Sequence, residues 1–147
     1  MMKNIILVTL CFTAMAFTIW QTDFETAKRV AAEKHQLILL NFSGSDWCGP
    51  CMRMRKEIFE NPGFVAMADS SLVLVNADFP RRKKNQLSGS VVKQNETLAD
   101  TYNPEGKFPF TLLLDAKGRV IKSWDGLPNL SAGQFAALVK TICNANR

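Results

Sequence analysis

The sequence lacks the features that mark several specialised classes of protein. It has one histidine, four cysteines, 8 glycines and 6 prolines in 147 residues, and no segment repeats along the chain. So little glycine and proline excludes a low-complexity chain, and so few cysteines exclude a miniprotein held together by disulfides. With 47% hydrophobic residues, the chain is instead suited to one globular domain with a buried core.

Positively charged residues are only slightly more numerous than negatively charged ones. There are 18 Lys and Arg against 13 Asp and Glu, which gives a formal net charge of +5. Four basic residues stand together at positions 81–84, without the interleaved aromatic residues that nucleic-acid binding favours, so we expect no nucleic-acid partner. The run could dock an acidic partner or a membrane surface, although four charges in a polar loop are more often simply solvated.

No hydrophobic run is long enough to span a membrane. The longest stretch, residues 5–20, has 16 residues, whereas a spanning helix needs about 20. Lys3 precedes it, and the small residues Ala14 and Ala16 occupy the positions that a signal peptidase reads. We therefore predict a signal peptide at residues 1–16, a mature domain at residues 17–147, and a periplasmic or secreted protein. The alternative is a retained N-terminal membrane anchor.

Helix and strand patterns alternate along the mature chain. The predicted helices cover residues 22–35, 48–60, 64–69, 90–102 and 131–144, and the predicted strands cover residues 37–42, 72–78, 110–115 and 120–124. Strands separated by helices favour parallel pairing, whereas the short turn at residues 116–119 makes the last two strands antiparallel. The expected fold is α/β, with a mixed central four-stranded sheet and helices on both faces.

Two cysteines stand three residues apart where a predicted strand gives way to a helix. In the first turn of that helix, Cys48 meets unpaired N–H groups and the positive end of the helix dipole, which favour its thiolate. Cys51 lies on the same helical face, within reach for a disulfide, and Pro50 is tolerated in a first turn. The spacing therefore predicts a redox-active dithiol.

The pair could also be a structural disulfide, half of a zinc site, or two core cysteines. Zinc would need four ligands, but there is no second Cys-x-x-Cys and His35 is the only histidine. A structural disulfide across so short a loop would constrain the unfolded chain little. We expect no metal site and no cofactor, and we interpret Cys143 as a buried packing residue of the last helix.

The segment Trp47-Cys48-Gly49-Pro50-Cys51 resembles the active-site motif of the thioredoxin family. Phe108-Pro109, before a predicted strand, resembles the cis-proline segment of the same fold. The sequence is similar above all to exported bacterial thioredoxin-like proteins and to the periplasmic thioredoxin-like domain of the transmembrane thiol:disulfide interchange reductase. These share a Ser-Asp-Trp-Cys approach to the helix and a Phe-x-x-Pro stretch, here residues 59–62. The resemblance covers about residues 20–143 and implies a thioredoxin fold.

The resemblance implies a thiol-disulfide oxidoreductase that reduces or isomerises protein disulfides. Cys48 would attack the substrate disulfide and Cys51 would resolve the mixed disulfide. The substrate-binding residues would be Trp47, Gly49, Pro50, Phe108 and Pro109. The implied partners are proteins with exposed disulfides and a membrane-bound thiol reductase as electron donor, and we expect a monomer. The alternatives are a copper chaperone that holds Cu(I) between the cysteines, or a partner-binding protein whose cysteines are idle.

One position departs from the family pattern. Thioredoxins carry a buried aspartate on the central strand, where it assists proton transfer at the resolving cysteine. The matching residue here is Asn41, which can form hydrogen bonds but cannot take up a proton. The resemblance therefore leaves water or Glu57 as the proton acceptor for Cys51.

Overall fold

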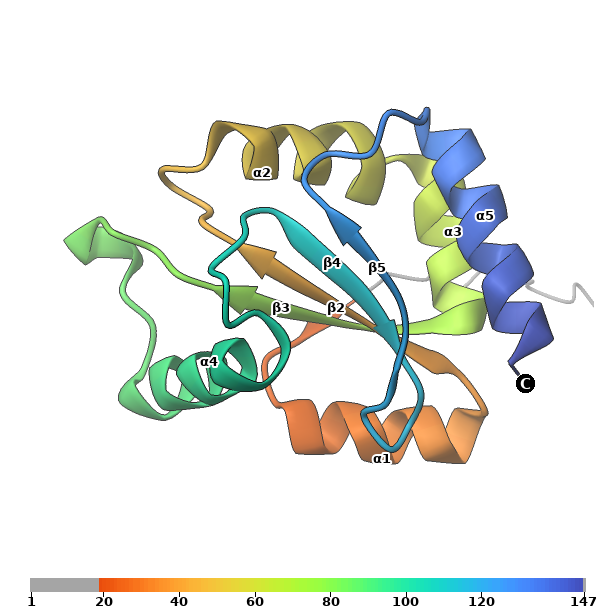
Figure 1. Cartoon of the computed structure of the whole chain (residues 1–147), viewed down its shortest axis with the longest axis horizontal. Coiled ribbons are helices and arrows are strands. Elements are labelled where there is room, and N and C mark those ends of the chain that lie inside the picture. The colour runs from red at the N-terminus through yellow and green to blue at the C-terminus, as the bar shows by residue number, and fades with distance from the viewer. Residues whose placement is uncertain (1–18, 147) are drawn as a thin grey trace, which may run out of the picture.

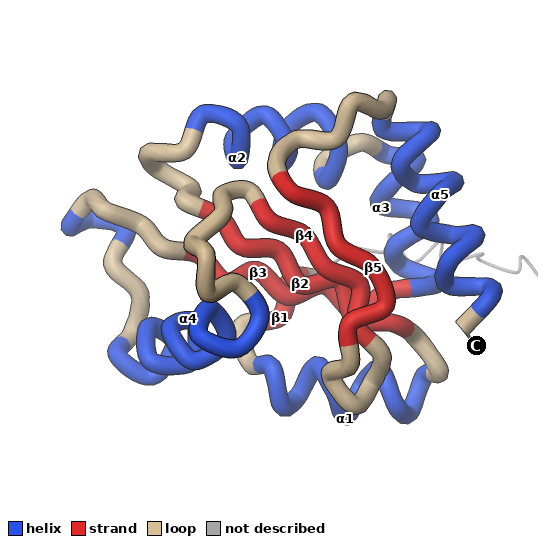
Figure 2. The backbone as a smooth tube through the Cα atoms, in the orientation of Figure 1, coloured by secondary structure: helices blue, strands red, loops and turns tan. Residues whose placement is uncertain are grey.

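A five-stranded mixed sheet forms the centre of the protein, in the order β1-β3-β2-β4-β5 (Figures 1 and 2). The computed structural model describes residues 19–146, so the predicted signal peptide at residues 1–16 lies outside the described part. The strands are β1 (Trp20–Gln21), β2 (Leu37–Ser43), β3 (Leu72–Asp78), β4 (Phe110–Leu114) and β5 (Val120–Asp125). The four predicted strands are confirmed. β1 is a fifth, and its two residues are too few to show a strand period.

The direction of β4 differs from the prediction. β1 and β2 run parallel to β3, whereas β4 runs antiparallel to both β2 and β5. Figure 1 shows why: α4 (Gly89–Tyr102) lies beside the carboxyl end of β3, so the chain starts β4 from that end. The prediction that the strands before and after this helix run parallel was wrong. A helical pattern in the sequence does not reveal at which end of the sheet the chain enters the next strand.

Helices cover both faces of the sheet, as predicted. α1 (Phe24–Lys34) and α4 lie on one face, and α2 (Gly49–Met54), α3 (Pro62–Ser71) and α5 (Ala132–Ala145) lie on the other (Figure 1). α2 continues directly into a π-helix at Arg55–Phe59. A capping box of Ser131 and Gln134 begins α5, and the side chain of Asp23 caps α1. Among residues 19–146, no helix is long and apolar enough to cross a membrane.

β2 holds the two halves of the core together. All seven of its residues are buried, with Leu37 and Leu39 facing α2, α3 and α5 and with Ile38, Leu40 and Phe42 facing α1 and α4. A strand that is apolar on both faces must lie inside a sheet, and β2 lies between β3 and β4. The carboxyl end of β2 is therefore fixed in position, and so is the start of the segment that follows Ser43.

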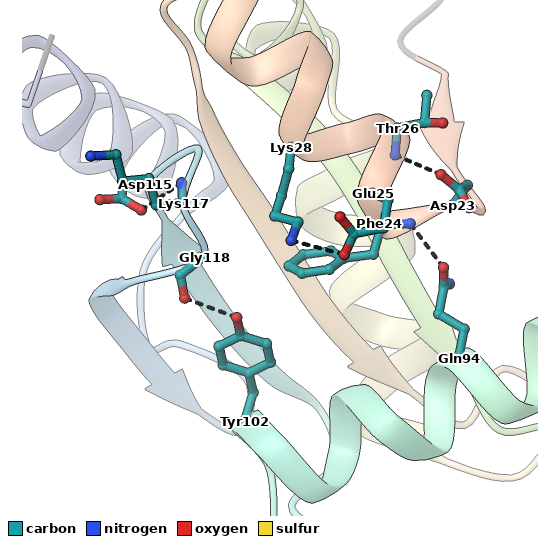
Figure 3. A network of polar contacts seen from close by, with 10 residues as sticks. All are labelled: Asp23, Phe24, Glu25, Thr26, Lys28, Gln94, Tyr102, Asp115, Lys117 and Gly118. Carbon is teal, nitrogen blue, oxygen red and sulfur yellow. Dashed lines mark hydrogen bonds and ion pairs between the residues drawn. The ribbon is translucent and has the colours of Figure 1, made fainter.

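Hydrogen bonds join α4 to two neighbouring segments (Figure 3). In the first half of α4, the Gln94 side-chain oxygen accepts from the backbone N–H of Phe24 at 2.9 Å. At its end, the Tyr102 hydroxyl donates to the backbone oxygen of Gly118 at 2.8 Å, and desolvation raises the pKa of Tyr102. Gly118 has a φ of +82°, and a Cβ there would lie 2.7 Å from the Tyr102 hydroxyl, so glycine is required. These contacts tie α4 to the start of α1 and to the turn between β4 and β5.

Candidate active site

Cys48 and Cys51 form a disulfide at the start of α2, with 5.2 Å between their Cα atoms. The chain leaves the buried end of β2 at Ser43 and turns, and Cys48 becomes the N-cap of α2. The backbone N–H of Cys51 donates to the Cys48 sulfur at 3.2 Å. This N–H is placed to donate a hydrogen bond to a thiolate on Cys48 once the disulfide is reduced.

Trp47 connects the cysteine turn to two other segments. Its indole N–H donates to the backbone oxygen of Phe79, just after β3, at 2.7 Å. Its ring meets Phe108 edge to face, with 5.4 Å between centroids, and the guanidinium of Arg81 lies 3.9 Å from its ring centroid. Trp47 is therefore held on several sides directly beside Cys48.

The peptide bond between Phe108 and Pro109 is cis, as predicted. Phe108 packs between two aromatic rings, those of Trp47 and Phe79, at centroid distances of 5.4 and 5.6 Å. Phe110, the first residue of β4, pairs with Phe42 near the end of β2. The structure thus brings the cis-proline segment to the end of the sheet where the cysteine turn begins. Gly49 and Pro50 are exposed there, in the first turn of α2.

The position of Trp47 depends on Gly44, a residue whose role is not evident from the sequence. A Cβ at Gly44 would lie 2.3 Å from Cε2 of the Trp47 ring, closer than any real contact. The backbone oxygen of Gly44 also accepts from the N–H groups of Trp47 and Cys48, at 3.2 and 2.9 Å. The absence of a side chain at Gly44 therefore leaves space for the indole of Trp47. The backbone oxygen of Gly44 also holds the turn that leads to Cys48.

Asp46 belongs to the Ser-Asp-Trp-Cys approach to the helix, and the structure gives it a role of its own. Its carboxylate accepts from the backbone N–H groups of Arg81 and Arg82 and from the side-chain amide of Asn85, each at 2.9 Å. The hydrogen bond from Arg81, with the others, lowers the pKa of Asp46 to about 2. The sequence shows a carboxylate close to the cysteine pair. It does not show what this carboxylate binds, because its partners lie more than 30 positions further along the chain.

Asp46→Asn is expected to weaken the folded state in a pH-dependent way. The pKa of Asp46 is lower in the folded than in the unfolded chain, so its contribution is present above about pH 4 and is lost as the pH falls towards about 2. The urea midpoint of Asp46→Asn should therefore be lower than that of the wild type at pH 7, with the difference shrinking at acidic pH. Equal differences at pH 7 and pH 3 would contradict this assignment.

Asn41 is buried, and both polar atoms of its side chain are hydrogen-bonded. Its amide donates to the side-chain oxygen of Asn76 at 3.0 Å, and its oxygen accepts from the Thr111 hydroxyl at 3.0 Å. Asn41 lines an open cavity of about 970 Å³ together with Ser45 and Cys51. The cavity gives water access to Cys51.

Glu57 lies elsewhere. It pairs with Arg53 at 3.1 Å and lines a different cavity, which Cys51 does not line. Of the two proton acceptors suggested for Cys51, this placement favours water.

The remaining candidates are structural. Within residues 19–146, no cluster of three or more His, Cys, Asp or Glu side chains could hold a metal ion. His35 ends α1 in the left-handed conformation, with a φ of 52°. Cys143 is 1% exposed and packs in the core on α5, as the sequence predicted.

Comparisons with known proteins agree with this geometry. A family model described as thioredoxin-like matches residues 19–116. The chain is 32% identical over 100 residues to the disulfide bond reductase DsbH of Chlamydia pneumoniae, and 30% identical over 103 residues to the thioredoxin-related protein DsbJ of the same organism. These matches cover 68% and 70% of this chain, but only 58% of DsbH and 29% of DsbJ.

Solved structures show the same fold. A structure of DsbH oxidoreductase superposes with a TM-score of 0.79 at 25% identity, over 97% of this chain and 95% of that chain. A thioredoxin from Thermus thermophilus gives a TM-score of 0.63 at 14% identity, over 86% of this chain and 88% of that chain. The carboxyl-terminal domain of Neisseria meningitidis DsbD, in its oxidised form, gives 0.54 at 17% identity, over 83% and 90%.

Proposed function

The chain belongs to the thioredoxin-like family, and on this premise we propose that it is an exported thiol-disulfide oxidoreductase that reduces or isomerises protein disulfides. The observation that carries the proposal is the Cys48–Cys51 disulfide at the N-cap of α2, at the same end of the sheet as the cis peptide before Pro109. A disulfide reductase among the relatives, DsbH, supports the same activity.

The reaction needs only the two sulfur atoms and a thiol donor. The Cys48 thiolate attacks one sulfur of the substrate disulfide, forming a mixed disulfide and releasing one substrate thiolate. The Cys51 thiol gives its proton to water in the neighbouring cavity, and its thiolate attacks the Cys48 sulfur. This step re-forms the Cys48–Cys51 disulfide and releases the second substrate thiolate. Two electrons pass from the dithiol to the substrate, whose two thiolates take up two protons.

Five residues around the disulfide would contact the substrate: Trp47, Gly49, Pro50, Phe108 and Pro109. Gly49 and Pro50 are exposed in the first turn of α2, and Trp47 contacts Phe108 across the site. The backbone of Phe108, just before β4, would pair with an extended substrate segment as an added strand. Binding through the backbone suits an enzyme that must accept disulfides in different sequences.

Export follows from the predicted signal peptide at residues 1–16, which would leave residues 17–147 as a monomeric thioredoxin-like domain. An oxidising compartment would hold Cys48 and Cys51 as the disulfide, so continued reduction of substrates requires a second dithiol as electron donor. We infer that a membrane-bound thiol reductase supplies these electrons. The protein partners are then of two kinds, the reductase and the clients with exposed disulfides.

The reduction potential of the Cys48–Cys51 pair tests the direction of the reaction. Equilibration with glutathione or dithiothreitol buffers should give a value near that of thioredoxin, about −270 mV. A value near about −120 mV, typical of strong oxidases, would overturn the reductase assignment. The same preparation should accelerate insulin reduction by dithiothreitol. If it does not, and the reduced protein instead binds Cu(I) tightly, a copper chaperone accounts for the pair better.

A further inference from the structure

The basic loop at residues 81–84 is exposed but firmly anchored. All four of its residues, two arginines and two lysines, are exposed. Its backbone is held by the carboxylate of Asp46, which accepts from the N–H groups of Arg81 and Arg82. Asp46 also binds the side chain of Asn85, which ends the 3-10 turn that begins at Lys83. The loop is therefore held in place by its backbone, while its charges lie on the surface.

The anchor places the basic loop beside the disulfide. The guanidinium of Arg81 stacks on the ring of Trp47, the residue immediately before Cys48. Figure 1 shows the segment between β3 and α4 extending at the same end of the sheet as the start of α2. A substrate whose disulfide lies against Cys48 therefore has part of its chain close to the basic loop.

The charges of the loop are not neutralised by ion pairs. In the described part of the chain, none of the four side chains forms a salt bridge, whereas Arg53, Arg55 and Lys107 each do. Asp46 is the carboxylate that faces the loop, and its oxygen atoms are occupied by the loop's own N–H groups and by Asn85. One negative charge against four positive ones leaves a strongly positive surface next to the site.

We propose that the basic loop docks an acidic segment of the protein substrate, next to the disulfide that is to be reduced. This inference rests on the proposed function and names the class of client it favours. Exposed charges of this kind act mainly on the rate of association, and their effect falls as salt is added. A membrane surface fits less well, because the loop is held against Trp47, at the end of the molecule where the substrate chain must lie.

Two disulfide peptides that differ only in flanking charge test the proposal. Each peptide closes one disulfide, with four aspartates beside it in one and four serines in the other. At about 20 mM salt, kcat/KM of the wild type should be about tenfold higher for the acidic peptide, and most of the preference should disappear at about 200 mM salt. The Lys83→Glu/Lys84→Glu variant should lose the preference and still reduce the serine peptide at the wild-type rate.

The matched control is Lys122→Glu/Lys140→Glu, which makes the same change of charge at exposed positions on β5 and α5. It should keep the preference. No preference in the wild type, or an equal loss in the control, would overturn the proposal. So would loop-dependent binding to vesicles of anionic phospholipid without any preference for the acidic peptide.

A binding assay separates this inference from the proposed function. An acidic peptide with serines in place of its cysteines should bind the wild type, measured by fluorescence anisotropy, and should bind Lys83→Glu/Lys84→Glu about tenfold more weakly. Loop-dependent binding without reduction of either disulfide peptide would support the docking surface and refute the oxidoreductase. Reduction of both peptides without loop-dependent binding would support the oxidoreductase and refute the docking surface.

Discussion

Replacing Cys48 with serine is expected to abolish disulfide reduction, leaving only the uncatalysed exchange between dithiothreitol and insulin. A serine hydroxyl is not a thiolate nucleophile, and the N–H of Cys51, now 3.2 Å from the Cys48 sulfur, would have no thiolate to stabilise. Cys51→Ser should behave differently. It keeps the attacking thiolate but cannot resolve the product, so a mixed disulfide between Cys48 and the substrate should accumulate, visible on a non-reducing gel and by mass spectrometry.

The pair of variants also tests which cysteine attacks. Cys48 and Cys51 are 5% and 4% exposed in the disulfide form, so exposure does not distinguish them. The assignment rests on Cys48 being the N-cap that accepts a hydrogen bond. Mixed disulfides that form with Cys48→Ser but not with Cys51→Ser would reverse the roles. Cys143→Ala is the matched control, because it removes a buried sulfur from α5 and should leave the rate of insulin reduction unchanged.

The fold could be predicted from the sequence wherever burial dictates a period. The apolar run at residues 37–42 predicted a strand, and β2 lies inside the sheet, where both of its faces are buried. The direction of β4 could not be predicted, since the sequence does not show that the chain begins β4 at the end of the sheet where β3 finishes. β1 could not be predicted either, because its two residues gain their strand conformation only by pairing with β3.

The site could be predicted as far as it is local in sequence. Cys48 and Cys51 are neighbours along the chain, and the cis peptide before Pro109 was expected from a short motif. The roles of Gly44 and Asp46 were not predicted. Gly44 is required by a ring three residues further on, in a turn whose shape the sequence does not reveal. Asp46 acts on a loop that is distant in sequence and reaches the site only after β3 has paired with β2.

Gly44→Ala should therefore be among the most damaging single-methyl changes in the molecule. The added Cβ would overlap the indole of Trp47, at 2.3 Å from Cε2, so the ring or the turn must move. Movement would weaken the bond from Trp47 to Phe79 and the stacking of Arg81. We expect the free energy of unfolding to fall by about 1–3 kcal/mol, and kcat/KM for insulin to fall by about 10- to 100-fold as Cys48 is displaced.

Gly133→Ala is the matched control for this substitution. Gly133 is exposed in the first turn of α5, and a Cβ there would meet no atom within 4 Å. The same methyl group should leave activity unchanged and stabilise the helix by up to about 1 kcal/mol. Urea unfolding and insulin reduction of both variants separate the two effects, provided that activity is measured where each protein is folded. A Gly44→Ala variant as stable and active as Gly133→Ala would show that the turn yields without cost, and that the close approach of Gly44 to Trp47 does not set the position of Cys48.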